Sequence, residues 1–445
     1  MFGGAGLRCI LLAIFCLLPA SSLTAQRQDY LGEPVRYEEA SRHDPLAKLQ
    51  QALAAGERPL IWDEEHGWLP SLLEALEAPI STQVLVFSKT SFQNDLIGPE
   101  RPRAIYFGDE AFIGWIPDAP LMEITAMDPV QGPTFYTVSQ DRQDPKIRRL
   151  DQECLQCHAS SRTRYWPGNL VRSVHPSESG RPILASGTFM TTQDSPLEER
   201  WGGWYVSGTH GKQRHMGNVV VADNAEESFV DREAGANITD LTPFFDTERY
   251  LSPHSDLVAL MVFEHQAQMQ NLLARASYQG RRAMDHQARM NEIFEEPDDY
   301  VSDTTKRRFQ AAAKLVVDHL LFREEALLQG PIAGSSSFAE EFAARGKRDS
   351  QGRSLRQLDL TRRLFRFPCS YLIDSDAFRN LPKPVLDLIW ADLEAILHHR
   401  KVDRDFPNLQ PADRKAILEI LRETVPEAAE RLSPPEPTSP EPDGS

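Results

Sequence analysis

One short stretch of the chain constrains its fold more than any other: Cys154-Leu155-Gln156-Cys157-His158 places two thiols and an imidazole within five positions. The two cysteines are spaced to lie on adjacent turns, and the histidine directly follows the second of them. With five cysteines and twelve histidines in 445 residues, chance produces this pattern in about one such chain in a thousand. This segment therefore has to fold around whatever the three side chains bind.

The C-x-x-C-H spacing is the attachment signature of c-type haem. Two thiols at this spacing can form thioethers with the two vinyl groups of one porphyrin, and the adjacent histidine is then held beneath the iron. We therefore predict one covalently bound haem c per chain, attached through Cys154 and Cys157, with His158 as the proximal iron ligand.

Three other uses of the cysteine pair fit the sequence less well. A thioredoxin-like redox pair opens a helix within a βαβ unit, whereas the surrounding sequence indicates antiparallel hairpins. A structural zinc site needs four ligands and usually a second cysteine pair, but beyond the N-terminal segment only Cys369 remains. A disulfide across two residues is rarer still.

The first 25 residues have the pattern of a signal peptide. Arg8 precedes the apolar run 9–18, and small residues follow as far as Ala25. The run is shorter than the ~20 residues that a membrane-spanning helix needs. We expect an exported, periplasmic protein with no stable membrane span after the signal is cleaved, which agrees with haem c because that cofactor is attached outside the cytoplasm.

The overall charge excludes one class of partner. The formal net charge is −17 and the sequence pI is about 5.2. Binding to nucleic acid requires clustered lysines and arginines, so we expect no nucleic-acid partner.

The hydrophobic patterning predicts an α+β fold. A strand-rich haem-c domain is expected over residues 26–235, an all-helical domain over 240–432 and a disordered tail over 433–445. A PAS- or Cache-like sensor domain is the better analogy for the first domain, because the compact cytochromes c are all-helical. Strands are expected at 83–88, 105–107, 112–116, 121–127, 134–138, 170–174, 183–189, 203–207 and 218–221. Helices are expected at 26–58, from Pro145 into the cysteine motif, and at 252–276, 303–328, 384–397 and 411–432.

The sixth iron ligand is sought in the glycine- and aromatic-rich segment 201–218. His215 is the first choice, His210 and Met216 follow, and His175, Met190, His265 or an open site remain alternatives. Flat aromatic side chains and arginines near the motif suit a porphyrin face and its two propionates. These are Tyr165, Trp166, Trp201, Trp204 and Tyr205, and Arg162, Arg164, Arg172 and Arg200.

The attachment motif resembles that of c-type cytochromes in general. Residues 87–91, 201–211 and 363–372 also resemble stretches of a group of exported bacterial proteins that carry a single haem-c motif. This resemblance implies haem binding at Cys154, Cys157 and His158, and electron transfer with a redox partner protein. A haem-based redox or gas sensor is the alternative, and a peroxidase-type enzyme fits less well because di-haem peroxidases need two attachment motifs.

Overall fold

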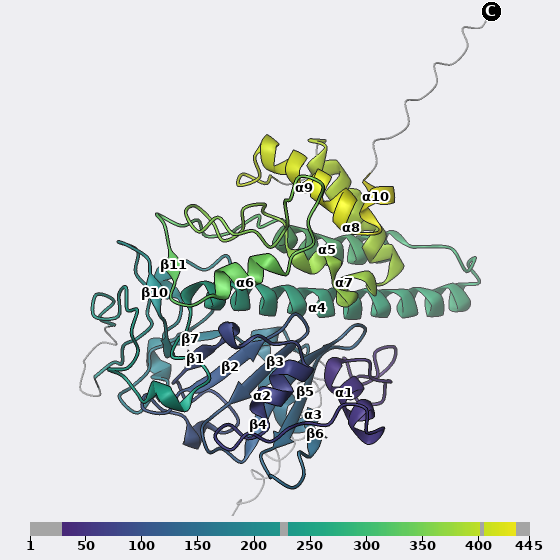
Figure 1. Cartoon of the computed structure of the whole chain (residues 1–445). Coiled ribbons are helices and arrows are strands. Elements are labelled where there is room, and N and C mark those ends of the chain that lie inside the picture. The colour runs from purple at the N-terminus through teal and green to yellow at the C-terminus, as the bar shows by residue number, and fades with distance from the viewer. Residues whose placement is uncertain (1–28, 223–229, 401–404, 433–445) are drawn as a thin grey trace, which may run out of the picture.

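The computed structural model describes residues 29–222, 230–400 and 405–432. A seven-stranded sheet forms one layer, and the long helix α4 (Leu257–Phe294) crosses one face of it, with most of the remaining helices of the C-terminal half stacked beyond (Figure 1). The chain is therefore α+β, as predicted. The predicted signal peptide (1–25) and tail (433–445) lie outside the described residues.

The main sheet is an antiparallel meander with one added edge strand. Its order is β6-β5-β4-β3-β2-β1-β9, so each of the first six strands pairs with its sequence neighbour. The strands are β1 (Val84–Val86), β2 (Arg103–Phe107), β3 (Ala111–Trp115), β4 (Leu121–Asp128), β5 (Gly132–Ser139), β6 (Ile147–Arg149) and β9 (Trp204–Tyr205). Two small two-stranded antiparallel sheets lie outside it, β7 (Arg172–Val174) with β8 (Thr188–Met190), and β10 (Gly208–Thr209) with β11 (Ala333–Gly334).

Both faces of this sheet are covered. Side chains alternate between the faces of a strand, and in β1 Leu85 belongs to one buried cluster while Val84 and Val86 belong to another. The face of Leu85 packs against α1 (Pro45–Ala54) and α2 (Leu69–Ala75). The opposite face packs against α4, which explains why the strands read as continuous apolar runs.

The C-terminal half is built around α4 and α5 (Asp303–Leu320). Asp256 caps α4 by accepting hydrogen bonds from the backbone N–H groups of Val258 and Ala259, which lack partners within the helix. Ser302 caps α5 in the same way. The remaining helices of this half are α6 (Phe338–Ala344), α7 (Asp376–Arg379), α8 (Lys383–Leu397), α9 (Pro411–Thr424) and α10 (Ala428–Arg431).

Most predicted strands and helices are found, but one error bears on the site. Pro145 does not start a helix: residues 147–149 form β6, in which Ile147 pairs with Val138 of β5, and α3 (Asp151–His158) begins after it. Residues 147–149 form a strand because β5 offers them hydrogen-bond partners, and a helix signal read from the local sequence takes no account of these partners.

The other differences concern lengths and boundaries. The predicted helix 26–58 is helical only from Pro45 to Ala54, and 218–221 contributes only an isolated bridge at Val221. Helix α4 extends to Phe294, eighteen residues beyond the predicted end at 276. The predicted helix 411–432 breaks after Thr424, because Pro426 cannot continue it.

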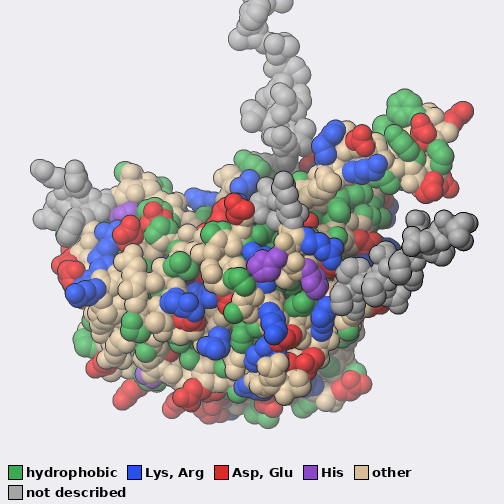
Figure 2. Space-filling view, turned by 90° about the horizontal axis from the view of Figure 1, so that it is seen from above, with side chains coloured by type: hydrophobic (Ala, Val, Ile, Leu, Met, Phe, Trp, Pro, Cys, Tyr) green, Lys and Arg blue, Asp and Glu red, His purple; other side chains and the backbone are tan. Residues whose placement is uncertain are grey.

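The two halves share buried surface. Phe107 and Phe135 of the sheet belong to the same buried cluster as Phe263 of α4 and Phe365. The division predicted between residues 235 and 240 stays a prediction, as does the PAS- or Cache-like analogy. Among the described residues no helix is long and apolar enough to cross a membrane. Basic and acidic side chains are interspersed over the face formed by the helical half (Figure 2).

Candidate functional site

Helix α3 carries the whole cysteine motif on eight residues (Figure 1). Leu155 anchors the helix because its side chain is buried in the cluster that joins the sheet to α4. Cys154 packs partly against that cluster, whereas Cys157 is exposed. Both cysteines are free thiols. The helix thus presents two unbonded sulfurs at the edge of the sheet layer.

The ring of His158 is held in one tautomer. Its Nδ1 donates to the carbonyl oxygen of Gly168 at 2.8 Å, and the Gly168 N–H in turn donates to the His158 carbonyl oxygen at 2.9 Å. Burial lowers the pKa of His158, so the imidazole is neutral at pH 7. With the proton on Nδ1, the lone pair lies on Nε2, which is the state that a metal-ligating histidine requires.

The loop after α3 is fastened to the long helix α4. The backbone N–H of Asn169 donates to Oδ1 of Asn271 at 2.7 Å, and Nδ2 of Asn271 returns a hydrogen bond to the Asn169 carbonyl oxygen at 2.9 Å. The ring of Trp166 stacks on Tyr278 with 5.1 Å between centroids. The ring of Phe135 lies 4.5 Å from that of His158. The position of His158 is therefore set by both the sheet and α4.

The thiol chemistry of Cys154 differs from that of a redox-active cysteine. Burial, followed by the charges of Glu123 and Glu153, raises its pKa to about 12. Catalytic cysteines of thioredoxin-like proteins have a lowered pKa, because the thiolate is the nucleophile. Helix α3 also follows an antiparallel edge strand, not the parallel strand of a βαβ unit. Both observations disfavour the thioredoxin-like alternative.

Four arginines gather around the motif without a carboxylate partner. Arg172 has an electrostatic interaction with Cys157 and a repulsive one with Arg162, and Arg275 of α4 is repelled by Arg164. Burial, and then these repulsions, lower the pKa of Arg172 and Arg275. The Nε atoms of both are buried and form no hydrogen bond within the described part of the chain. Among described residues none of the four is in an ion pair with a carboxylate, so the site has excess positive charge.

Arg200 does not belong to this group. It was predicted as a propionate partner, but its Nη1 lies 3.0 Å from Oε2 of Glu264 in a fully buried ion pair. Its Nη2 donates to the carbonyl oxygens of Gln193 and Ser195. Arg200 is therefore part of the protein core beside α4, and Arg275 is the arginine that the sequence-based prediction missed.

The predicted sixth ligand His215 is buried beside Trp201 and His210, with ring centroids at 5.3 and 4.7 Å. Its Nδ1 accepts a hydrogen bond from the backbone N–H of Gly217 at 3.0 Å. Burial lowers its pKa to about 3, so the ring is neutral and Nε2 carries the proton. In this tautomer His215 has no free lone pair for a metal. Ligation would require the ring to exchange that hydrogen bond for another.

The other predicted axial groups differ in availability. Both ring nitrogens of His210 form hydrogen bonds, one with the Gln213 carbonyl oxygen and one with the Asn237 N–H. Both ring nitrogens of His265 lie within 2.8 Å of a side-chain oxygen, one of Gln193 and the other of Ser370. Met216 is fully buried, and its Sδ lies 3.7 Å from the Ser173 hydroxyl.

Met190 is placed differently. It is the register partner of Arg172, the arginine that interacts with Cys157. Met190 is only partly buried and belongs to none of the described buried clusters. His175 follows the same strand β7, and its Nδ1 is buried without a hydrogen bond.

The aromatic residues predicted around the motif fall into different environments. Trp166 lines the loop that holds His158, and Tyr165 beside it is exposed. Trp201, Trp204 and Tyr205 are buried in the protein core. Only the first two therefore remain candidates to face a planar group at α3.

Sequence reasoning missed three contributors to the site: Gly168, Asn271 and Arg275. Asn271 and Arg275 are four residues apart on α4, and this spacing puts both on one helical face. This i, i+4 spacing was the available signal, although other polar residues of α4 share it. Of the three stretches that support the resemblance, 87–91 and 201–211 lie in contact, since the N–H groups of Phe87 and Ser88 both donate to the Gly203 carbonyl oxygen.

No known protein family, no curated protein and no solved structure matches the chain. Within the described residues, no three histidine, cysteine or acidic side chains gather as a metal site. The arrangement around α3 can nevertheless present two thiols, one neutral imidazole lone pair and several unpaired guanidinium groups to one bound molecule.

Proposed function

We propose that the chain is a c-type haem protein that transfers electrons, with one haem bonded through Cys154 and Cys157 and ligated by His158. The observation that carries the proposal is the tautomer of His158. Its Nδ1 proton is committed to the Gly168 carbonyl oxygen at 2.8 Å, which leaves Nε2 free for iron next to two free thiols on the same helix.

The residues around α3 fit the covalent attachment of a porphyrin. Thioether formation consumes thiols, and Cys154 and Cys157 are unpaired. A hydrogen bond from Nδ1 to a backbone carbonyl is the usual outer-shell partner of a ligating histidine, because it fixes the ring and raises the basicity of Nε2. Of the two cysteines that would form the thioethers, Cys154 is partly buried and Cys157 is exposed.

The excess positive charge supports the same cofactor. A haem carries two propionates, and guanidinium groups bind carboxylates through paired hydrogen bonds. The buried, unpaired Nε atoms of Arg172 and Arg275 are donors without acceptors in the described structure. Such groups cost free energy when buried, and propionates at this place would satisfy them. Arg162 and Arg164 extend the positive surface toward solvent.

For the sixth position we keep His215 as the predicted ligand and add Met190 as its competitor. The hydrogen bond from Gly217 opposes ligation by His215, whereas Met190 is the register partner of Arg172, which interacts electrostatically with Cys157. A His215→Ala variant and a Met190→Ala variant, each purified with haem, separate the two by the absorption spectrum. A change to high-spin haem in one variant alone identifies the ligand, and no change in either leaves an open site or another residue.

When bound, the haem supplies the one-electron change between Fe(III) and Fe(II). The chain's own residues hold it, set the basicity of the proximal imidazole and place positive charge near the propionates. We propose a periplasmic or otherwise exported location and a redox partner protein, because the predicted signal peptide and haem attachment outside the cytoplasm agree.

A haem-based sensor is the second candidate. The hydrogen bond from Gly217 that opposes ligation by His215 also favours this function. Without a sixth ligand the iron would be five-coordinate and would bind small gases. Carbon monoxide separates the two functions: rapid binding to the reduced protein supports the sensor, and a six-coordinate spectrum unaffected by carbon monoxide supports electron transfer.

The test of the proposal is the spectrum of the full chain purified from a host that attaches c-type haem. The expected result is a redox-active haem that stays with the polypeptide after denaturation. A colourless protein, or haem that is extracted into acidified organic solvent, would contradict it.

A further inference from the structure

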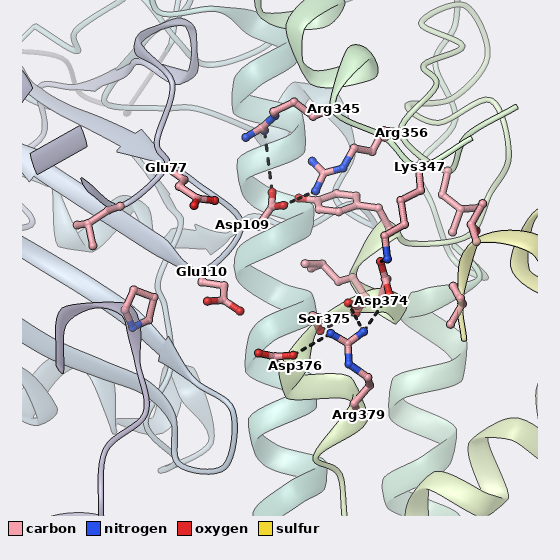
Figure 3. A pocket seen from close by; sticks show the side chains of 18 of the residues that line it. Glu77, Asp109, Glu110, Arg345, Lys347, Arg356, Asp374, Ser375, Asp376 and Arg379 are labelled. Carbon is pink, nitrogen blue, oxygen red and sulfur yellow. Dashed lines mark hydrogen bonds and ion pairs between the residues drawn. The ribbon is translucent and has the colours of Figure 1, made fainter. Parts of the chain in front are cut away.

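A cleft of about 680 Å³ opens between the sheet half and the helical half, on the side of α1 and α2 (Figure 3). Its size falls within the ~300–1,000 Å³ typical of small-molecule sites. None of the residues assigned above to the haem site lines it. The sheet contributes Asp109 and Glu110 at the turn between β2 and β3, and the C-terminal half contributes the segments 345–347, 354–356 and 371–379.

The two walls of the cleft are linked by one side chain of α4. Gln266 donates through Nε2 to the Gly108 carbonyl oxygen at 2.7 Å, and its Oε1 accepts from the Tyr371 hydroxyl at 2.6 Å. Gln266 is almost completely buried. The two walls are therefore joined by buried hydrogen bonds, which would have to break for the walls to separate at this point.

One end of the cleft carries an excess of positive charge. Arg345 and Arg356 share the single carboxylate of Asp109, so this trio has a net positive charge (Figure 3). The guanidinium of Arg356 lies 4.1 Å from the ring centre of Tyr371 and 4.9 Å from that of Phe342, which fixes its plane. Its Nη1 is buried and has no hydrogen-bond partner in the described structure. It is a preoriented donor that lacks an acceptor.

The facing wall carries the opposite charge. Glu110 is partly buried and is in no ion pair with a described residue. Burial, and then the charge of Asp376, raises its pKa, and the nearby Lys48 offsets this only in part and forms no ion pair with it. Figure 3 shows Glu110 on the sheet side of the cleft, away from the arginines. A cationic group of a ligand would supply the missing partner.

Some of the remaining charges of the cleft are already paired, whereas Lys48, Arg58 and Glu77 line it without an ion pair to a described residue. Asp374 pairs with Lys347 and Arg379, and Arg379 also pairs with Asp376. Between the charged groups, apolar side chains also line the cleft, each exposing a small part of its surface there. The apolar side chains are Leu49, Leu76, Leu355, Leu372 and Val425.

We propose that this cleft binds an amino acid or short peptide with apolar side chains, through its free carboxylate at Arg356 and Arg345 and its free ammonium at Glu110. Both ends of the ligand contribute, because the arginine end carries excess positive charge and Glu110 offers a carboxyl that forms no ion pair with a described residue. The assignment does not depend on the haem and adds a second ligand site to the chain.

Calorimetric titration of the haem-loaded full chain tests the proposal with four probes: leucine, trileucine, N-acetyl-trileucine and trileucine amide. We expect one of the two zwitterionic probes to bind with a dissociation constant below about 1 mM, and either blocked peptide to bind at least about tenfold more weakly than trileucine. Leucine and trileucine distinguish a free amino acid from a peptide. Absence of binding by both below about 10 mM overturns the proposal, as does equal binding of the blocked peptides.

Two variants locate the site. Glu110→Gln keeps the shape of the side chain and should weaken the zwitterion at least about tenfold while leaving N-acetyl-trileucine unchanged. Arg345→Gln should weaken the zwitterion but leave trileucine amide unchanged. The matched control is Glu39→Gln, an exposed acid outside the cleft. Unchanged binding in both cleft variants would place the ligand elsewhere and overturn the assignment.

Discussion

The side-chain amide of Asn271 on α4 forms two hydrogen bonds with the backbone of Asn169, of 2.7 and 2.9 Å. Asn169 directly follows Gly168, whose carbonyl oxygen holds the ring of His158. A residue more than a hundred positions along the chain thereby fixes the orientation of the proposed iron ligand. The histidine is positioned by the long helix as much as by its own helix α3.

Replacing Asn271 tests this relationship. In Asn271→Ala, the Gly168 carbonyl is less firmly held and its hydrogen bond to His158 weakens. The imidazole then donates less electron density to iron, which favours Fe(II), so we expect the reduction potential to rise by on the order of tens of millivolts. A redox titration measures it, with Gln268→Ala on the same helix as control. A potential equal to that of the wild type would remove Asn271 from the positioning of His158.

The unpaired arginines lead to a second prediction, in which the reduction potential falls. Arg172→Gln and Arg275→Gln each remove a positive charge that has no carboxylate partner among the described residues. Positive charge near the iron favours the reduced form, so each variant should lower the reduction potential. The exposed, already paired Arg289→Gln is the control. Unshifted potentials in both variants would contradict the placement of the haem beside them.

The buried ion pair of Arg200 and Glu264 predicts a large effect on stability. Arg200→Met leaves the Glu264 carboxylate without its partner in the core, which should reduce the free energy of unfolding by about 3–5 kcal/mol. Adding Glu264→Met should recover a large part of this loss, because two apolar side chains need no compensation. Chemical denaturation measures both. Equal stability of single and double variants would show that the charge is not the cause.

His319 predicts a dependence on pH. It is buried against α4, and burial lowers its pKa from its ordinary value to about 4. A lowered histidine pKa contributes stability that is present above the unfolded pKa of about 6.5 and is lost as the pH falls toward 4. Over this window His319→Phe should lose about 1.4 kcal/mol less per pH unit than the wild type. Parallel curves of unfolding free energy against pH would contradict the neutral state of His319.

The elements that sequence patterns predicted well are those whose signal is local. The turn at Gly108-Asp109 joins β2 and β3 as expected, because the two apolar runs that flank it are close in sequence and pair with each other directly. Helix α5 has the predicted apolar face of Phe309, Ala312 and Val316. Where the partner is distant in sequence, local signals fail: β6 forms by pairing with β5, and no pattern near Pro145 reveals that edge.

The same distinction applies to the candidate site. The cysteine motif is a local pattern and indicates the chemistry by itself. The partners of Arg200 and His158 lie on other elements, so Arg200 was placed among the propionate ligands although it pairs with Glu264 of α4. Hydrogen bonds likewise decide which histidines have a nitrogen free to bind iron. The hydrogen bond from Gly217 to His215 and the two hydrogen bonds of His210 cannot be predicted from the spacing of residues in the sequence.

The mass of the purified polypeptide is the most direct test of the account. The full chain is produced in a host that attaches c-type haem, beside a Cys154→Ala, Cys157→Ala double variant, and both are analysed after denaturation. The account predicts the added mass of one haem on the wild-type chain and none on the variant. A wild-type chain without added mass, or a variant that retains it, would contradict covalent attachment at α3.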